Sequence, residues 1–373
     1  MKSAQTGPHL HFVTPDLFGP IGGIARISRA TALALATWAR AHGGRLHVDA
    51  LCDSGEAPDP TYLPPDVATY RAWHSDRRGL ALAVAKAGWQ LGGYATVFGH
   101  VNLAVTGLLQ SPIARQALIA HGIEIWQPFP LKHLDRRLAL RRQHAIWPIS
   151  RYTADRVHTA HSVPWHRLHV IPNALDPQWR PTDTERTPPT GRPRLLSVCS
   201  LAIGFEYKGV DVAIEALSHL AGPERPVLDI VGHGEDRGRL EALAQRLGVR
   251  DDVLFHGRVD DDALSALYAA AGAFVLPSTR EGFGLVFIEA MAHGLPILTV
   301  SAGAAPEVVQ DGVTGRLVAP QAPAALASAI SELLGDPKAA FAMGQQGRAA
   351  VLERYTFPIY EAHIHTALDA LFA

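Results

Sequence analysis

Short apolar or β-branched segments alternate along the chain with longer segments of helical periodicity, and this alternation constrains the fold more than any other feature. It predicts parallel strands joined by helices that cover both faces of a sheet. In the first half we expect strands at residues 9–14, 46–51, 96–100, 117–121, 145–149 and 168–171, and helices that include 24–40 and 151–158. In the second half we expect strands at 194–199, 227–231, 253–256, 273–276, 296–300 and 316–318. The chain is therefore expected to be an α/β protein.

A proline-rich segment without periodicity, residues 176–193, separates the two series and predicts a linker. A chain of 373 residues has room for two or three domains. We therefore expect one doubly wound domain over residues 1–175 and a second over residues 194–357. The last residues, 358–373, have helical spacing and could pack back across the first domain.

Composition and charge exclude several classes of protein. Lysine plus arginine number 34 and aspartate plus glutamate 35, and this near-neutral balance argues against a dedicated nucleic-acid-binding protein. Hydrophobic residues make up 47% and charged residues 18%, which excludes an unfolded chain. Cys52 and Cys199 lack the spacing of a zinc site or a disulfide framework, and the histidines lack metal-binding spacing on a helix. We expect no metal.

The apolar segments bear on localisation. The N-terminus lacks an apolar run long enough for a signal peptide. The most apolar stretch, residues 80–109, is interrupted by polar residues and glycines, whereas a membrane span needs about 20 consecutive apolar residues. The expectation is a cytoplasmic protein of a reducing compartment, which touches at most the inner face of the plasma membrane.

The most informative motif is LPSTREGFGLVFIEAMAHGLP, residues 276–296, in which a strand, a glycine-rich loop and a helix from about Leu285 to His293 follow one another. A helix N-terminus behind such a loop presents free N–H groups that suit a pyrophosphate. Carboxylates are acceptors for sugar and ribose hydroxyls, and Glu281 and Glu289 lie on either side of the helix start. The layout describes a nucleotide-sugar site, although two glutamates alone would more often be an ordinary helix-start acid and a solvated helix position.

The whole motif closely resembles the signature of glycosyltransferase family 4, whose members are retaining enzymes. This resemblance implies the GT-B fold, in which two doubly wound Rossmann-like domains face each other across a cleft, the acceptor in the first and the nucleotide-sugar in the second. It also implies that Glu281 faces the donor sugar and that Glu289 binds the ribose hydroxyls. The donor-binding loop of the resemblance comprises Gly282, Phe283, Gly284 and Leu285.

The segment LLSVCSLAIGFEYKGVDVAIEAL resembles the family's first strand, loop and helix of the second domain, where an arginine and a lysine grip the donor diphosphate. Lys208 matches the lysine, whereas Ser200 occupies the place of the arginine. The resemblance thus leaves the second positive charge open. Arg280, Arg258 and Arg26 are the alternatives.

Other segments of the second domain match less closely. Gly232 and Gly234 in VGHG follow a strand and either approach the phosphates or form a plain strand-to-helix turn. Arg258 and Val259 resemble the residues that border the nucleobase. The D-x-D at 260–262 immediately precedes a helix, so we interpret it as an N-cap with favourable dipole charges rather than a metal site.

In the first domain, Gly22 and Gly23 lie between the first strand and the first helix and resemble the family's glycine loop, although a tight strand-to-helix turn is the competing explanation. His121 ends a predicted strand and matches the family's active-site histidine, which helps to hold the donor sugar. A satisfied histidine at a strand end is the alternative. His100 ends the preceding strand and is a second candidate.

Residues 131–147, LKHLDRRLALRRQHAIW, combine five basic residues with leucines. A solvated helix packed by its leucines is the default interpretation. A basic amphipathic helix also suits contact with an anionic membrane, as an enzyme with a polyprenyl-diphosphate-linked acceptor would need.

The expected function is transfer of a hexosyl group from a nucleotide diphosphate sugar, GDP-mannose or a UDP-hexose, to a hydroxyl of a glycan or lipid-linked oligosaccharide in polysaccharide biosynthesis. In the mechanism usually proposed for such retaining enzymes, the leaving diphosphate itself accepts the proton. We expect Glu281, Lys208 and His121 to be the catalytic residues, with no cofactor. The alternatives are a nucleotide-sugar epimerase or hydrolase, a pyridoxal-dependent glycan phosphorylase and a non-catalytic glycan-binding protein.

Overall fold

The computed structural model describes residues 7–19, 22–55, 57–89, 94–179, 191–222 and 225–373. The chain divides into two compact units, Met1–Trp179 with Tyr355–Ala373, and Arg180–Arg354. Most of the expected proline-rich linker, residues 180–190, lies outside the described residues. Within the described residues, no helix is long and apolar enough to cross a membrane.

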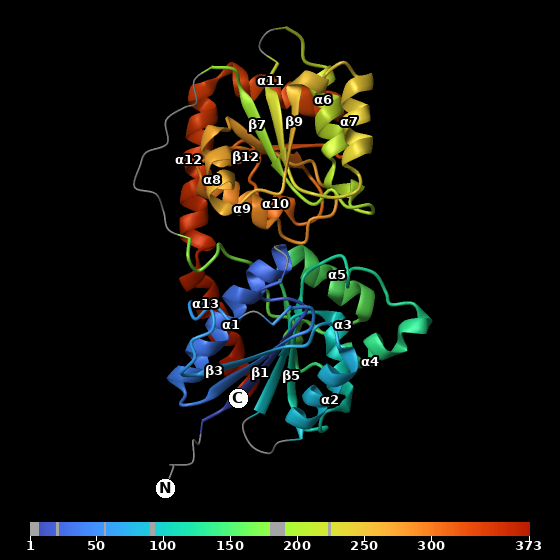
Figure 1. Ribbon diagram of the computed structural model, residues 1–373, viewed down its shortest axis with the longest axis vertical. Helices are drawn as coiled ribbons and strands as arrows, with labels where there is room; N and C mark the ends of the chain where they lie inside the picture. Colours follow the sequence, from blue (N-terminus) through green and yellow to red (C-terminus); the bar gives the residue numbers. More distant parts are fainter. Residues whose placement is uncertain (1–6, 20–21, 56, 90–93, 180–190, 223–224) are drawn as a thin grey trace. The chain divides into compact units, whose positions relative to one another are not determined.

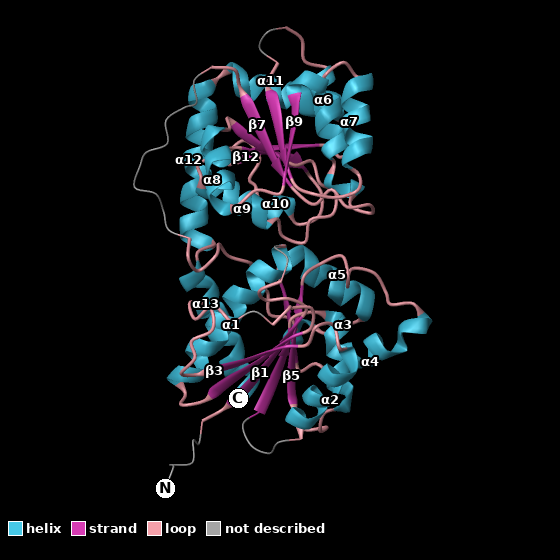
Figure 2. Ribbon diagram, in the orientation of Figure 1, coloured by secondary structure: helices cyan, strands magenta, loops and turns pink. Residues whose placement is uncertain are grey.

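The first unit is built on a parallel six-stranded sheet in the order β3-β2-β1-β4-β5-β6 (Figures 1 and 2). Helices α1 and α13 lie on one side of this sheet, and α2, α3 and α4 lie on the other (Figure 1). The strands are β1 His9–Thr14, β2 Arg45–Ala50, β3 Ala68–Ala72, β4 Tyr94–Phe98, β5 Arg115–Ala120 and β6 Ala145–Pro148. The helices are α1 Gly23–Ala41, α2 Arg77–Gly88, α3 Val101–Ala104, α4 Leu134–Arg142, α5 Arg151–His161 and α13 Phe357–Phe372.

The second unit repeats the plan with strand order β12-β11-β10-β7-β8-β9, again all parallel. Its strands are β7 Arg194–Val198, β8 Val227–Val231, β9 Val253–Gly257, β10 Ala273–Val275, β11 Ile297–Val300 and β12 Gly315–Val318. Its helices are α6 Val210–Ser218, α7 Arg237–Arg246, α8 Asp261–Ala270, α9 Leu285–Ala292, α10 Ala305–Val308, α11 Pro323–Gly335 and α12 Pro337–Arg354. The expected α/β class with two doubly wound sheets is therefore confirmed.

Two strand predictions in the first unit are wrong. The sheet has an edge strand that the sequence pattern did not indicate, β3, because its residues are half-buried or exposed and include no long apolar run. Residues 168–171 form no strand and contribute a single bridge between Leu168 and Ile146. The segment still lies along β6, since the N–H groups of His169 and Ile171 donate to the carbonyls of Ile146 and Pro148, both at 2.9 Å.

The basic stretch 131–147 is not one helix, contrary to expectation. A 3-10 turn, Leu131–His133, is followed by α4, and Trp147 is buried in β6. Leu131, Leu134 and Leu138 are 80%, 56% and 45% exposed, so these three leucines do not pack the segment onto the unit.

In the second unit, the interpretation of residues 260–262 as a helix N-cap is confirmed. The Asp260 carboxylate caps α8 by accepting from the N–H of Ala263 at 2.8 Å.

The final helix, α13, belongs to the first unit and packs on α1. The hydroxyls of Thr31 and Tyr360 are 2.7 Å apart. Farther along, the Trp38 indole N–H donates to Asp369 at 2.8 Å. These buried and half-buried polar contacts fix the register of two helices that are more than 300 residues apart in the sequence.

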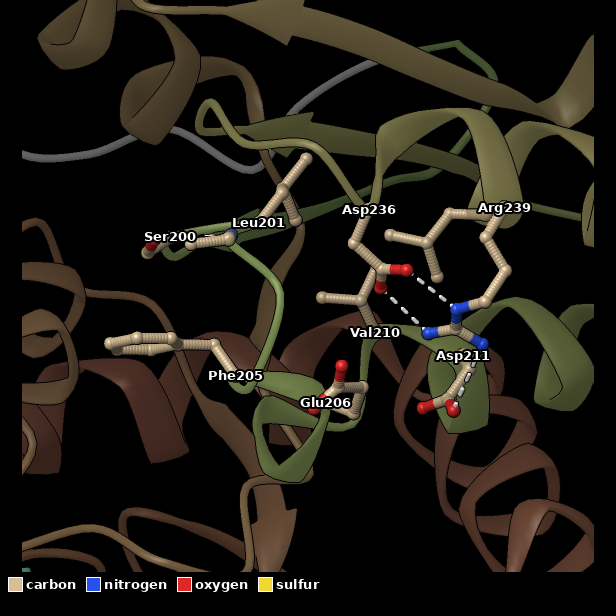
Figure 3. Close-up of a pocket in the computed structure, with 10 residues that line it drawn as sticks. Ser200, Leu201, Phe205, Glu206, Val210, Asp211, Asp236 and Arg239 are labelled. Carbon is tan, nitrogen blue, oxygen red and sulfur yellow. Dashed lines mark hydrogen bonds and ion pairs between the residues drawn. The ribbon is translucent and has the colours of Figure 1, made fainter.

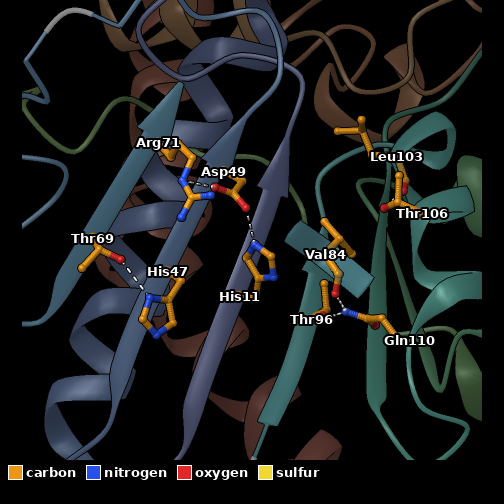
Figure 4. Close-up of polar contacts among 10 residues, drawn as sticks. All are labelled: His11, His47, Asp49, Thr69, Arg71, Val84, Thr96, Leu103, Thr106 and Gln110. Atoms are coloured by element: carbon orange, nitrogen blue, oxygen red, sulfur yellow. Dashed lines mark hydrogen bonds and ion pairs between the residues drawn. The ribbon is translucent and has the colours of Figure 1, made fainter. Parts of the chain in front are cut away.

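A polar layer crosses the sheet of the first unit (Figure 4). His11 Nε2 lies 2.9 Å from a buried oxygen of Asp49, and the Arg71 guanidinium lies 3.9 Å from the other carboxylate oxygen. Farther along the layer, the Gln110 amide donates to the hydroxyl of Thr96, a residue of β4, at 2.8 Å. Pairing within the layer offsets the cost of burying these groups. In the described part of the chain, no three His, Cys, Asp or Glu side chains are grouped to hold a metal ion.

Candidate active site

The loops that follow the strands of the second unit gather at one edge of its sheet, because the carboxyl ends of parallel strands point the same way. Strands β7 and β10 are neighbours in that sheet. The loop after β7 carries Lys208, in the 3-10 turn Glu206–Lys208, and the loop after β10 carries Glu281. Sheet order thus brings together two residues that are 73 positions apart in the sequence.

Lys208 and Glu281 form the central ion pair of this edge. Lys208 Nζ donates to Glu281 Oε1 at 2.7 Å, and the two side chains are only 19% and 8% exposed. The two loops are also joined by their backbones, since the N–H of Thr279 donates to the Tyr207 carbonyl at 2.9 Å. A half-buried, charge-assisted hydrogen bond of this kind holds its partners more firmly than a surface pair does.

Two glycines allow the pair to form. Gly209 has φ +73°, and a Cβ there would overlap the carbonyl oxygen of Pro277, so only glycine lets α6 begin this close to the end of β10. Gly303 has φ +58°, and a Cβ there would lie 2.7 Å from the Glu281 carbonyl oxygen. That same oxygen accepts from the N–H of Ala304 at 2.9 Å. Gly303 is a supporting residue that the sequence analysis missed, although its place just after a predicted strand is a signal.

Burial and charge act in opposite directions on Lys208. Burial lowers the pKa of its ammonium group, but the Glu281 carboxylate more than offsets this, and the net pKa lies above its ordinary value. Lys208 is therefore positively charged at neutral pH. Burial also raises the pKa of the neighbouring Cys199 thiol to about 12, so that residue stays a neutral thiol.

The glycine-rich loop feeds α9 as expected. Gly284 is the N-cap of α9, Leu285 is the first helical residue, Gly282 is half-buried and Phe283 is buried in the unit. The first N–H groups of α9 therefore lie at the end of the loop that starts with Glu281. They supply partial positive charge at the edge that holds Lys208.

Glu289 lies one turn inside α9, where its Oε2 accepts from the Tyr268 hydroxyl of α8 at 3.3 Å. Arg258 is exposed and Val259 half-buried in the loop between β9 and α8. Gly232 and Gly234 follow β8, and a Cβ on either would overlap the backbone of Cys199 or Leu201. These two glycines therefore pack against the chain that leaves β7.

Ser200 is exposed on the loop after β7, at the rim of a small pocket (Figure 3). The guanidinium that lines this pocket, Arg239, donates to Asp236 at 2.6 Å and lies 3.6 Å from Asp211. The two carboxylates balance its charge.

Among the alternative cations, Arg280 lies over the ring of Tyr207 at 5.9 Å, and Lys208 Nζ is 5.5 Å from the same ring. Arg26 lies on α1, in the first unit. The structure thus brings Arg280, of the three arginines, to the ring beside Lys208.

In the first unit, His100 and His121 lie at the carboxyl ends of β4 and β5 with ring centroids 6.4 Å apart. His121 Nε2 is 2.7 Å from the Gly99 carbonyl, which can only accept, so Nε2 carries the proton and Nδ1 is an acceptor in the neutral ring. His100 Nδ1 accepts from the N–H of Asn102 at 3.2 Å, which leaves its Nε2 as a donor. Burial lowers the pKa of His100, which is therefore neutral at neutral pH.

The glycine loop of the first unit is described in part. Gly22 is exposed as the N-cap of α1 and Gly23 is the first helical residue, whereas residues 20 and 21 lie outside the described residues. The buried carboxylate of Asp53 accepts from the N–H groups of Leu17 and Gly19 and from the Tyr70 hydroxyl. Asp53 therefore holds the segment that leads to the glycines. Its 34 positions of separation from Gly19 explain why the sequence analysis missed it.

Comparisons with known proteins identify the family. A match to the family Glycosyl transferases group 1 spans residues 184–350. The chain is 34% identical over 273 residues to the GDP-mannose-dependent alpha-(1-6)-phosphatidylinositol monomannoside mannosyltransferase of Mycolicibacterium smegmatis, covering 66% of this chain and 69% of the relative. It is 30% identical to the MMP alpha-(1->4)-mannosyltransferase of Mycolicibacterium hassiacum, covering 69% of this chain and 63% of the relative.

Solved structures resemble the whole chain. Sucrose-phosphate synthase of Thermosynechococcus elongatus superposes with a TM-score of 0.76 and 21% identity, over 98% of this chain and 99% of that one. Anabaena HepE in complex with UDP and glucose gives 0.74 and 21%, over 97% and 99%. At these identities the likeness establishes the GT-B fold. Together with the relatives, it shows that the chain belongs to the glycosyl transferases group 1 family and is a glycosyltransferase.

Proposed function

We propose that this glycosyltransferase is a retaining, metal-independent hexosyltransferase that uses a nucleotide diphosphate sugar. The observation that carries the proposal is the half-buried Lys208–Glu281 pair beside the N-terminus of α9. A lysine ammonium has three N–H donors, and Glu281 takes one of them, which leaves two for phosphate oxygens. The same edge therefore offers a cation for a diphosphate and a carboxylate for sugar hydroxyls.

In the proposed reaction, an acceptor hydroxyl attacks the anomeric carbon on the face from which the diphosphate departs. The bond between that carbon and the diphosphate oxygen breaks, and a diphosphate oxygen takes the proton of the hydroxyl. Lys208 and the first N–H groups of α9 stabilise the negative charge that develops on the diphosphate. Glu281 orients the donor sugar, and His121 accepts a hydrogen bond from a sugar hydroxyl through Nδ1.

Nucleotide recognition is assigned to the remaining residues of the second unit. Glu289 is proposed to accept hydrogen bonds from the ribose hydroxyls, and Arg258 and Val259 are proposed to border the base. Charge for the diphosphate comes from Lys208 and helix dipole groups in this proposal, so no metal ion and no prosthetic group is invoked.

The donor and acceptor are proposed by analogy. The name of the M. smegmatis relative specifies GDP-mannose and a mannosylated lipid, whereas the HepE structure contains UDP and glucose. We propose GDP-mannose as the donor, with a UDP-hexose as the alternative. The acceptor is proposed to be a hydroxyl of a glycan or of a lipid-linked sugar in polysaccharide or glycolipid assembly.

A lipid-linked acceptor requires access to a membrane surface. Leu131, Leu134 and Leu138 are exposed on the segment that also carries Lys132 and Arg141. Apolar side chains among basic ones suit the interface of an anionic bilayer. We therefore propose peripheral contact through residues 131–142, which co-sedimentation with vesicles that contain phosphatidylglycerol would measure; a Leu131→Ser/Leu134→Ser variant should bind less.

The deciding experiment is a transfer assay in chelator with GDP-mannose or UDP-glucose and a panel of sugar acceptors. The proposal expects acceptor-dependent release of one nucleotide diphosphate and a product with the donor's anomeric configuration by NMR. Sugar release without acceptor would indicate a hydrolase or epimerase instead. A requirement for added divalent metal would contradict the metal-independent part.

A further inference from the structure

A separate cavity of about 540 Å³ lies in the first unit, at the amino ends of β5 and β6. His100 and His121 are at the opposite, carboxyl end of this sheet, so the cavity is distinct from the site described above. Its volume is within the range of pockets that hold small organic ligands. Arg115, His144, His166 and His169 line it.

The ionisable side chains of this cavity are one arginine and three histidines. Every ionisable side chain among its described lining residues is a base. Burial lowers the pKa of His144, and the positive charges of Arg142, Arg115 and Arg167 lower it further. Ala370, Leu371 and Ala373 of the C-terminal segment also line the cavity.

Two of the bases are held in place as hydrogen-bond donors. His144 Nδ1 accepts from the N–H of Gln116 at 3.2 Å, so in the neutral ring Nε2 carries the proton. Arg115 donates through Nη1 to the Leu371 carbonyl at 2.7 Å and lies over the ring of Phe372 at 5.7 Å. The guanidinium is thereby positioned by α13, and its planar fork can present further N–H groups to a ligand.

We propose that this cavity binds the oxyanion of a phosphate group. Fixed donors from Arg115 and His144 meet two or more oxygens of the anion, and the imidazole rings of His166 and His169 line the same wall. The partly apolar wall formed by Ile113, Ala145 and Leu371 leaves room for the organic part of a phosphate ester. A soluble phosphate ester and a phospholipid headgroup share this chemistry.

The proposal has a pH dependence of known sign. Burial lowers the pKa of His169 as well as that of His144. A bound anion favours the protonated rings and so opposes this effect, which means that binding takes up protons and tightens as the pH falls. The charged groups that act on His144 are Arg142 of α4, Arg115 of β5 and Arg167.

The test is a titration of the full chain with sulfate at constant ionic strength, followed by NMR of isotope-labelled histidine rings. Sulfate keeps both negative charges between pH 6 and pH 8, so only the protein titrates. The ring signals of His166 and His169 should shift together, with a Kd about 10-fold lower at pH 6 than at pH 8. Inorganic phosphate at pH 8 should shift the same signals.

Three variants separate this cavity from other anion sites. His166→Gln/His169→Gln should raise the sulfate Kd about 10-fold or more. The exposed His219 lies in the second unit, so His219→Gln should change nothing. Lys208→Met removes the proposed diphosphate cation and should leave the ring shifts intact, so failure here and failure of the transfer mechanism are distinguishable. Absence of ring shifts in the wild type, or an unchanged Kd in the double variant, overturns the proposal.

Vesicle binding distinguishes the two sources of phosphate. Phosphatidic acid in phosphatidylcholine vesicles should sediment the wild type but less of the His166→Gln/His169→Gln variant if the ligand is a headgroup. Equal sedimentation of both proteins, together with ring shifts by inorganic phosphate, supports a soluble ester. If neither probe distinguishes the variant from the wild type, the cavity is not a phosphate site.

Discussion

The carboxyl edges of the two sheets carry chemically different side chains. At the carboxyl edge of the second unit, Lys208 and Glu281 form a half-buried ion pair beside a helix N-terminus. At the same edge of the first unit, His100 and His121 are neighbouring rings oriented by backbone groups, and burial lowers the pKa of His100. Charge suits a diphosphate, and neutral donors and acceptors suit sugar hydroxyls. The two units share one fold, so it is their loops that place an ion pair at one edge and two imidazole rings at the other.

The largest expected effect comes from the charged edge. Lys208→Met should lower kcat by about 100- to 1000-fold, because the developing charge on the leaving diphosphate loses its cation. It should also lower the thermal midpoint, since the carboxylate of Glu281 is left buried without its partner. A matched control is the exposed Lys338→Met, which should leave both unchanged.

A double variant separates the two effects of Lys208. Lys208→Met/Glu281→Gln removes the unpaired charge and should recover part of the thermal midpoint without recovering activity. Circular dichroism melts and a single-turnover transfer assay provide the two measurements. Activity in Lys208→Met above a third of the wild-type value would contradict the assignment.

A smaller effect is expected at the neutral edge. His121→Asn should lower kcat/KM for transfer by about 10- to 100-fold, because a misoriented sugar reacts slowly. The Kd for GDP or UDP by calorimetry should remain within twofold of the wild type, whereas Lys208→Met should raise it. The exposed His363→Asn serves as control. A loss of nucleotide affinity in His121→Asn would contradict the proposal that Lys208 binds the diphosphate and His121 orients the sugar.

A smaller, indirect effect is expected at Asp53, because this residue positions the loop before α1 and is not proposed to contact the substrates. Asp53→Asn loses the charge that accepts from the consecutive backbone N–H groups of residues 17–19, which should hold this segment less firmly. We expect KM to rise about 3- to 10-fold with a smaller change in kcat. Asp66→Asn, on the exposed pair with Arg40, should alter neither. Equal changes in kcat and KM for Asp53→Asn would argue against a positioning role.

The smallest effects concern pH and differ in sign between the edges. Burial lowers the pKa of His100, so the folded state binds this proton less readily than the unfolded state does. The stability that His100 contributes is therefore present above pH ~6.5 and is lost as the pH falls through its folded pKa. Denaturant titrations between pH 5 and pH 8 should show a shallower decline for His100→Gln than for the wild type.

Lys208 shows the opposite dependence. Its pKa is raised in the folded state, so its contribution is complete below the unfolded value of about 10.4 and is lost as the pH rises through the folded value. Denaturation at pH 9 and pH 11 should reveal a loss that is absent in Lys208→Met/Glu281→Gln. An equal loss in both proteins would show that other groups govern the alkaline limb.

Local patterns predicted much of the fold and part of the site. Strands β1 and β8 were predicted with their observed bounds, because both are short, buried segments rich in apolar and β-branched residues. The half-exposed edge strand β3 gave no such signal. The extent of the helix in residues 131–147 was also wrong, since Leu131, Leu134 and Leu138 have helical spacing although α4 covers only Leu134–Arg142.

The sequence by itself determined most of the elements and the chemistry they carry: two series of parallel strands, the loop and helix start around Gly284, and the candidates Lys208, Glu281 and His121. Only the tertiary structure decided which of these residues meet. The pairing of Lys208 with Glu281 depends on β10 lying beside β7, and the contact of Asp53 with Leu17 depends on β2 lying beside β1. Strand order arises from packing of the whole sheet, so no local pattern encodes it.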